Sequence, residues 1–453
     1  MKSKAYIVEY LQDEKWLPLD VMSVNTLRWN EWKREPGVGA FAHMRTEKEN
    51  LRLRITKRGV REWNVVPFDL VKNMDERIGV IEFTMKNGSS VSVEPSGDKS
   101  ENLMIRLSRP VDIEATGSVA CTQIYRLSAG IHTLENCDRI SLYEGIPTLL
   151  LRDGDHIILE EGAVLRSRIL GEGVSNVAVT GTGILDMTEW NGSPENSDTR
   201  RDAIFLDKFC KNVYIADITI RNSAFFCIRT HAVTNLEVKG ISAFTGVFEG
   251  DGIDLHGAID VKISDCLLRN SDDCIALYPS RSDMRNVEVT NCVLWSDLAH
   301  AINIGVHGSG RANDRHYAEN IVFKDMRILE VRCPSVDYQG AIAISLGDES
   351  ICRHVAFEDF IVEDFSDSQL FVFKVMQLRP WNATPGYRIE HVLLKNIFYR
   401  GQNKNGSALL GYDAERIVDD VAIENLKING EQMTSLDMAG IQINDFVKHI
   451  TIK

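Results

Sequence analysis

The chain has 453 residues, 44% of them hydrophobic and 26% charged, so it can bury a large core and two domains are expected. Its 51 basic and 65 acidic residues give a formal net charge of −14, which argues against a nucleic acid or an anionic membrane surface as partner. Nine cysteines without a C-x-x-C pair indicate free thiols, and the first ten residues contain no apolar signal-peptide core. We therefore expect a cytoplasmic protein, or a secreted one if a leader has been removed.

The first part of the chain, residues 1–115, contains short runs of alternating apolar and polar residues. Ile78 to Met85 leads through Asn87-Gly88 into Ser89 to Val93, and Asn-Gly between alternating runs is the strongest short signal for a β-hairpin. Further strands are expected at Ala5 to Tyr10, Leu51 to Thr56 and Leu103 to Leu107. These runs predict a small antiparallel β-sandwich.

Residues 116–453 show a repeat in which an Asn, Asp or His precedes apolar-x-apolar. The repeats begin at Asn176, Asn212, Asn235, Asp260, Asn286, Asn320, His354, His391, Asp420 and His449. Their spacing of 23 to 37 residues lies in the range of solenoids. Each interval holds a second period-2 run, such as Ala301 to Ile304, and no helical period intervenes. We therefore predict a right-handed parallel β-helix, with irregular first coils between Ile131 and Leu170.

Three polar residues occupy the same place in consecutive repeats. Asp251, Asp273 and His300 each lie two residues before the isoleucine of a short apolar strand. Because stacked parallel strands lie about 4.8 Å apart, these side chains are expected to form one column, with Asp272 beside them on the preceding turn.

Such a carboxylate cluster suits acid/base chemistry. Unpaired carboxylates a few ångströms apart repel and raise each other's pKa, so a solenoid would avoid stacking them unless the site used them. Hydrolysis of a glycosidic bond needs one carboxylic acid to protonate the leaving oxygen and one carboxylate to activate water or attack carbon. Clustered aspartates can keep one member protonated and the others ionised, and His300 can regulate that proton or bind a sugar hydroxyl.

From about Gly171 onward the chain resembles the pectinase-type (pectin-lyase-like) β-helix glycosidases of families 28, the polygalacturonases, and 49, the dextranases and isopullulanase. Glu249-Gly250-Asp251-Gly252 is similar to their Asn-Thr-Asp-Gly motif, Asp272-Asp273-Cys274 matches their second motif, and Ala299-His300-Ala301 keeps the histidine of Gly-His-Gly. The resemblance implies that Asp272 is the general acid, that Asp251 and Asp273 position the water, and that the anomeric carbon is inverted. A one-rung spacing by itself is nearer to the carboxyl separation of retaining enzymes, about 5 to 5.5 Å.

The substrate is expected to be a neutral α-linked glucan, of the dextran type, rather than polygalacturonate. Polygalacturonases carry an Arg-x-Lys pair for the uronate, and the corresponding strand, Ala341 to Leu346, has no basic residue. Contacts to substrate are expected from Asp254, Tyr278, Arg281, Asn303, Tyr338, Lys374 and Trp381. Lys374 or a loop arginine could still bind a uronate, which keeps a polygalacturonase as the alternative.

Three other functions remain open at this stage: a polysaccharide lyase that holds Ca²⁺ on aspartates, a fructan transferase, and a solenoid that binds carbohydrate without catalysis. No metal-ligand spacing, phosphate loop or nucleophile elbow is present, so no cofactor or metal is expected. The sequence does not indicate an oligomeric state.

Overall fold

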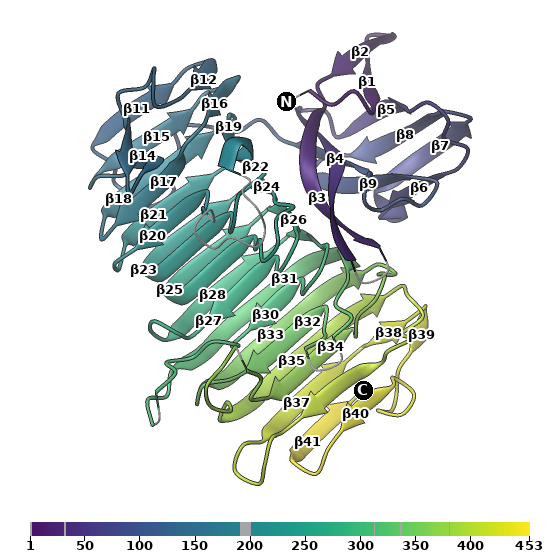
Figure 1. The fold of residues 1–453 in the computed structure, drawn as a ribbon. Helices are drawn as coiled ribbons and strands as arrows, with labels where there is room; N and C mark the ends of the chain where they lie inside the picture. Colours follow the sequence, from purple (N-terminus) through teal and green to yellow (C-terminus); the bar gives the residue numbers. More distant parts are fainter. Residues whose placement is uncertain (1, 31–32, 191–200, 312, 336–337, 380) are drawn as a thin grey trace. The chain divides into compact units, whose positions relative to one another are not determined.

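The structure is a computed structural model that describes residues 2–30, 33–190, 201–311, 313–335, 338–379 and 381–453. The chain divides into two compact units, Met1–Asp112 and Ile113–Lys453 (Figure 1). Both units consist of strands, and no helix in the described residues is long and apolar enough to cross a membrane.

The first unit is a sandwich of two five-stranded sheets that share one apolar core. One sheet has the order β2 (Lys15–Leu19), β1 (Ile7–Gln12), β5 (Asn50–Thr56), β8 (Val80–Lys86) and β7 (Val71–Arg77). The other has the order β3 (Met22–Asn30), β4 (Lys33–Arg45), β10 (Leu103–Ser108), β9 (Ser89–Pro95) and β6 (Trp63–Val66), with a short 3-10 helix at Phe68–Leu70. All pairs are antiparallel except β4 and β10, which run parallel.

The hairpin expected at Asn87-Gly88 is wrong. β8 pairs with β5 and β7, whereas β9 pairs with β6 and β10, so the turn joins strands of opposite sheets. Asn87 is buried, and its amide donates to the carbonyls of Thr46 and Lys48 at 2.6 and 2.9 Å. These bonds to a distant segment hold the turn at the edge of the sandwich, which a local turn signal could not indicate.

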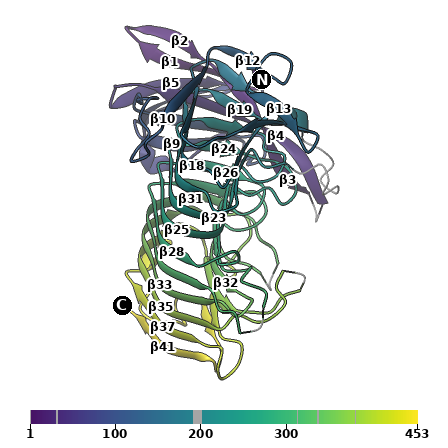
Figure 2. The same cartoon turned by 90° about the vertical axis from the view of Figure 1, so that its left-hand side faces the viewer.

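The second unit is a right-handed parallel β-helix, whose described strands form one 31-stranded sheet. Its strands are β11 (Gln123–Leu127), β12 (Gly130–His132), β13 (Ile140–Tyr143), β14 (Ile146–Leu150), β15 (Asp155–Leu159), β16 (Ala163–Leu165), β17 (Arg168–Glu172), β18 (Ser175–Gly181), β19 (Ile184–Asp186), β20 (Ile204–Asp207), β21 (Lys211–Ala216), β22 (Thr219–Arg221), β23 (Ile228–Lys239), β24 (Ser242–Phe244), β25 (Ile253–Ser264), β26 (Leu267–Asn270), β27 (Ile275–Tyr278), β28 (Met284–Thr290), β29 (Val293–Ser296), β30 (Ile302–Ile304), β31 (Tyr317–Val331), β32 (Ile342–Leu346), β33 (Ile351–Val362), β34 (Phe371–Val375), β35 (Arg388–Tyr399), β36 (Ser407–Leu410), β37 (Val418–Glu424), β38 (Lys427–Ile428), β39 (Glu431–Gln432), β40 (Ile441–Ile443) and β41 (Val447–Ile452). A second 3-10 helix spans Thr188–Trp190. Figure 2 shows the coils stacked from β23 through β28 and β35 to β41.

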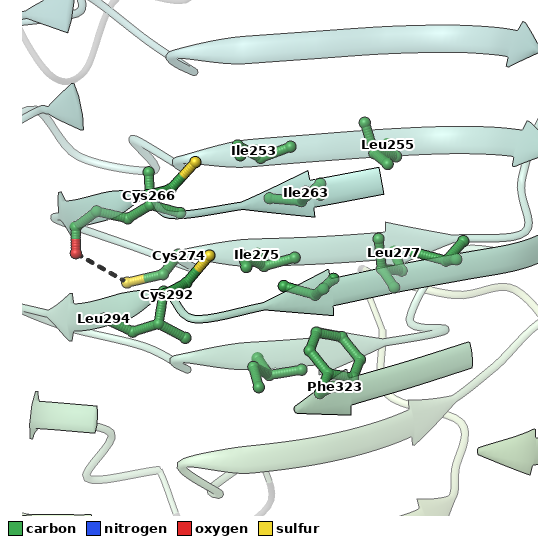
Figure 3. Close-up of a cluster of buried hydrophobic side chains, with 14 of the residues drawn as sticks. Ile253, Leu255, Ile263, Cys266, Cys274, Ile275, Leu277, Cys292, Leu294 and Phe323 are labelled. Carbon is green, nitrogen blue, oxygen red and sulfur yellow. Dashed lines mark hydrogen bonds between the residues drawn. The ribbon is translucent and has the colours of Figure 1, made fainter. Parts of the chain in front are cut away.

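Apolar side chains fill the inside of the coils. One buried column runs through Ile228, Ile253, Ile275, Ile302, Ile342 and Phe371. Figure 3 shows part of this core, where Ile253 and Leu255 of β25 lie over Ile275 and Leu277 of β27. Each fully buried aliphatic side chain contributes about 1.5–3 kcal/mol, so the isoleucines fix the register of neighbouring coils.

The ten residues that begin the sequence repeats form a ladder at one corner of the coils. All ten, from Asn176 to His449, have positive φ values between +51° and +59°. Asn212 donates to Asn176 at 2.8 Å, Asn286 donates to Asp260 at 2.8 Å, and further along the ring of His354 stacks on His391. Asn and Asp tolerate this left-handed bend, which explains the repeat. We call these ten residues the corner ladder.

Candidate active site

Three turns of the β-helix place the side chains of Asp251, Asp273 and His300 in one column. Each residue lies two positions before the isoleucine that opens β25, β27 or β30. Those isoleucines are register partners in the order Ile253, Ile275 and Ile302. The Gly252 N–H donates to the Asp273 carbonyl at 2.8 Å, and the Cys274 N–H donates to the His300 carbonyl at 3.0 Å. The column indicated by the sequence therefore forms, and we call it the aspartate column.

Gly252 is required for the close approach of these turns. A Cβ at this position would lie 2.3 Å from the Cys274 carbonyl oxygen and 2.5 Å from Asn270 Oδ1. A side chain here would push the two turns apart and move Asp251 away from the next rung.

The carboxylates of Asp251 and Asp272 converge on one backbone amide. The Asp273 N–H donates to Asp251 Oδ1 at 3.2 Å and to Asp272 Oδ1 at 3.1 Å. Asp251 is buried, whereas Asp272 is partly exposed. The Ser296 hydroxyl donates to the Asp272 carbonyl at 2.9 Å and fixes this turn against the next coil.

Asp273 accepts four hydrogen bonds. Its Oδ1 receives the His300 N–H at 3.0 Å and lies 2.7 Å from His300 Nδ1. Its Oδ2 receives the Tyr278 hydroxyl at 3.2 Å and the Asn303 amide at 2.8 Å. These four donors hold the Asp273 carboxyl group in one orientation.

Asp254 lies on the outward face of β25, only 1% exposed. His256 Nε2 is 3.0 Å from Asp254 Oδ1. Arg229, its register partner on β23, adds positive charge one rung away.

The acids of the site have separated pKa values. Burial, followed by the charge of Asp273, raises the pKa of Asp272 to about 8, with Glu249 adding to the rise and His300 opposing it. Burial and the charges of Asp272 and Asp254 raise the pKa of Asp251 well above its usual range. Burial opposes ionisation of Asp254, but His256 and the contact with Asp251 lower the pKa of Asp254 below its usual value. The cluster thus holds protonated and ionised carboxyl groups side by side.

His300 is fully buried between Asp273 and Tyr338. Burial favours the neutral ring, but the charge of Asp273 and its hydrogen bond raise the pKa of His300 well above the usual value. Nε2 lies 3.2 Å from the Tyr338 carbonyl, and the Tyr338 ring meets the imidazole edge-on at 4.4 Å. Asn303 donates to the Tyr338 hydroxyl at 2.6 Å and to Asp273 Oδ2 at 2.8 Å, so it links the two neighbours of His300.

The structure brings two of the expected substrate contacts, Tyr278 and Asn303, directly to Asp273, and Asn303 links Tyr338 to it. Asp254 lies near Asp251. The Trp381 side chain is 40% exposed, and its backbone hydrogen-bonds His307, whose ring lies 5.0 Å from Tyr278.

Two expected cations lie further from the column. Lys374 of β34 is the register partner of Ser345 on β32, two coils beyond Asn303. Arg281 is exposed in the loop after β27.

Two residues at the column position were not anticipated. Asp202 and Phe226 lie two residues before Ile204 and Ile228, and these isoleucines continue the same register. Asp202 is buried and pairs with Arg229 at 2.6 Å. Asp251 was identified by its place two residues before an isoleucine, and the same criterion identifies Asp202 and Phe226.

Across the residues that the structure describes, no group of three or more His, Cys, Asp or Glu side chains is arranged to hold a metal ion. Cys266 and Cys292 are buried in the core (Figure 3).

Comparison with known proteins places this site in a family. The family model "Glycosyl hydrolases family 28" matches residues 157–436, a stretch that contains the whole aspartate column. The chain belongs to this family, which confirms the resemblance to pectinase-like β-helix glycosidases and the expected enzyme class.

Among curated relatives, polygalacturonase-2 of Solanum lycopersicum is 28% identical over 26% of this chain and 25% of its own length. Probable endopolygalacturonase C of Aspergillus aculeatus is 23% identical over 54% of this chain and 65% of its own length. The chain thus spans less than two thirds of the length of these relatives.

Two solved structures share the fold. Dex49A from Penicillium minioluteum has a TM-score of 0.64 at 12% identity and covers 100% of this chain and 94% of its own. The family 28 exopolygalacturonase of Yersinia enterocolitica has a TM-score of 0.53 at 15% identity, with 89% and 93% covered. They support the β-helix architecture.

Proposed function

We propose that the protein hydrolyses α-glycosidic bonds of a poly- or oligosaccharide with inversion at the anomeric carbon. The observation that carries this proposal is the convergence of Asp251 and Asp272 on the Asp273 N–H, beside the Asp273 carboxyl group. This arrangement supplies a protonated acid and a charged carboxylate within one small site, as glycoside hydrolysis requires.

Asp272 acts as the general acid. It is partly exposed, so a sugar can reach it, and burial of the carboxyl group together with the charge of Asp273 raises its pKa to about 8, which keeps the proton at neutral pH. As the bond from C1 to the leaving oxygen breaks, the Asp272 proton passes to that oxygen. A water on the opposite face of the ring attacks C1 and gives its proton to a neighbouring carboxylate.

The preferred substrate in this proposal is uncharged, as in an α-glucan. The outward positions of β32 after Asn303 are Ala343 and Ser345, both buried, and neither supplies a cation. A uronate carboxylate that entered beside four aspartates would meet repulsion, which weak solvent screening strengthens.

Galacturonan oligomers are the second candidate. The curated relatives are named as polygalacturonases, and Lys374 lies over Ser345, where its ammonium group could meet a uronate.

The test is a reducing-sugar assay on dextran, isomalto- and malto-oligosaccharides, and polygalacturonate and its oligomers, with the product anomer followed by NMR. We expect the highest kcat/KM on an uncharged chain and a β-anomer as first product. A higher kcat/KM on galacturonate oligomers that falls in Lys374→Gln would establish the second candidate instead. Failure to hydrolyse any α-linked chain would refute the proposed activity.

A further inference from the structure

The coil before Asp251 carries a phenylalanine at the column position. Phe226 lies two residues before Ile228, which is the register partner of Ile253. The Cys227 N–H donates to the Asp251 carbonyl at 2.9 Å, the same kind of bond that joins the rungs of the aspartate column. Phe226 therefore occupies the rung next to Asp251, one strand spacing of about 4.8 Å away.

The backbone of Phe226 is held from both sides. Its carbonyl accepts the Ala203 N–H at 3.0 Å and the Ser223 hydroxyl at 2.6 Å. Its N–H hydrogen-bonds the carboxyl group of Asp202. The side chain is half-buried, and its ring stacks on that of Phe225 with the centroids 3.9 Å apart. The ring is thus fixed before a ligand arrives, so little conformational entropy opposes binding.

An arginine joins this rung to the outward face of the sheet. The guanidinium of Arg229 pairs with Asp202 at 2.6 Å. Three half-buried rings surround it at 4.3, 5.9 and 5.5 Å from their centroids, those of Phe205, Phe225 and Phe226. Arg229 is also the register partner of Asp254, so these residues adjoin the aspartate column. We call Asp202, Phe205, Phe225, Phe226 and Arg229 the phenylalanine–arginine cluster.

The phenylalanine–arginine cluster offers aromatic surface and a cation that is already paired. Burial raises the pKa of Asp202 and the charge of Arg229 opposes the rise, so an anionic sugar would compete with Asp202 for the guanidinium. The His231 ring meets Phe205 edge-on at 4.9 Å. It is neutral at neutral pH, because burial and nearby positive charges lower its pKa to about 4. Binding sites of this kind, aromatic with few polar groups, suit the C–H face of an uncharged sugar.

We propose that the phenylalanine–arginine cluster is a subsite for one uncharged sugar unit, the unit beyond the two that the cleaved bond joins. Phe226 packs against a face of this unit and determines specificity, and Arg229 positions the rings. The inference rests on the proposed function, to which it adds a preference for chains of at least three sugars.

A chain-length series tests the subsite. Uncharged α-linked oligosaccharides of two and three units are compared by kcat/KM, and by Kd in the inactive Asp272→Asn background with titration calorimetry. The wild type should favour the trisaccharide over the disaccharide by about tenfold or more, because only the trisaccharide reaches Phe226. Phe226→Ala should reduce this ratio by about tenfold in both measurements.

Two further variants separate binding from folding. Phe226→Trp keeps an aromatic face and should retain the preference for the trisaccharide. Phe209→Ala removes a ring that is 66% exposed in the loop after β20, outside the phenylalanine–arginine cluster, and should leave the ratio at the wild-type value. Thermal unfolding of each variant checks that the fold is retained.

The charge of the bound unit is tested with galacturonate oligomers and Arg229→Gln. We expect the Asp272→Asn protein to bind the uncharged trisaccharide more tightly than the galacturonate trimer. Tighter binding of the galacturonate trimer that is lost on adding Arg229→Gln would overturn the inference, since the unit bound would then be anionic.

An unchanged trisaccharide-to-disaccharide ratio in Phe226→Ala would also overturn it and leave the phenylalanine–arginine cluster a structural element. The binding constants are measured without turnover, so failure of the subsite and failure of the proposed hydrolysis are distinct results. Absence of wild-type turnover on every α-linked chain would refute the proposed function instead.

Discussion

Two polar columns run along the same β-helix, and they are built on opposite principles. In the corner ladder neighbouring side chains pair donor with acceptor, as where the Asn286 amide donates to Asp260 and the His391 ring lies 2.6 Å from Asp420. At the aspartate column, the carboxyl groups of Asp251 and Asp272 instead share one donor, the Asp273 N–H. The first arrangement stabilises the coil, whereas the second costs stability and is explained by the chemistry that it permits.

Replacement of the acid should give the largest effect. We expect Asp272→Asn to reduce turnover by about 10²- to 10⁴-fold, because an amide cannot protonate the leaving oxygen. The melting temperature should stay equal or rise, since the amide cannot ionise beside Asp273 as the pH rises. Steady-state kinetics and thermal unfolding measure both quantities.

Asp265→Asn is the matched control for this variant. Asp265 lies at a bend of positive φ and accepts the Asn291 amide at 2.7 Å, away from the aspartate column. Asn fits this bend, so turnover should be unchanged. A comparable loss of turnover in Asp265→Asn would show that the loss does not depend on a place in the aspartate column.

The pH dependence should be the next largest effect. Because the acid must be protonated, activity should fall about tenfold for each pH unit above the Asp272 pKa of about 8. The pKa of Asp272 is higher in the folded state than in the unfolded state, where it is about 3.9. The contribution of Asp272 to the unfolding free energy is therefore complete below about pH 3.9 and is lost as the pH rises toward 8. Unfolding free energies of the wild type and Asp272→Asn between pH 5 and 8.5 should converge at low pH. A constant difference across this range would contradict the assignment.

A change in the corner ladder should affect stability alone. We expect Asn286→Ala to lower the unfolding free energy by about 1–2 kcal/mol, because alanine must adopt a left-handed conformation and two ladder bonds are lost. Turnover should remain near the wild-type value. Denaturant unfolding measures the first quantity, and a large fall in kcat would show that the two columns are coupled.

The smallest expected effect is a gain in stability. Asp251→Asn removes one member of the carboxyl cluster, so its melting temperature should equal or exceed that of the wild type, and the gain should grow as pH rises. A clearly lower melting temperature of Asp251→Asn at pH 8 would indicate that the folded protein stabilises the ionised form of Asp251.

Much of the fold could be predicted because the β-helix is repetitive. Each coil repeats the same apolar alternation, and a fixed offset from an isoleucine is enough to align Asp251, Asp273 and His300. The sandwich lacks this regularity. The Asn87-Gly88 signal predicted a local hairpin. Instead, the hydrogen bonds from Asn87 to the carbonyls of Thr46 and Lys48 fix the path of the chain at this turn, and the spacing of residues in the sequence does not indicate them.

The sequence by itself determined the stacked coils, the column of acids and the missing cations of β32, because these depend on residue type at a repeated position. Only the tertiary structure decided which partners each acid has. Asp272 and Asp273 are neighbours in the chain, yet Asp272 is partly exposed, whereas Asp273 is buried and accepts four hydrogen bonds. Those donors come from β27, β30 and the turn before β30, so the difference arises from packing between coils and not from either residue's own segment.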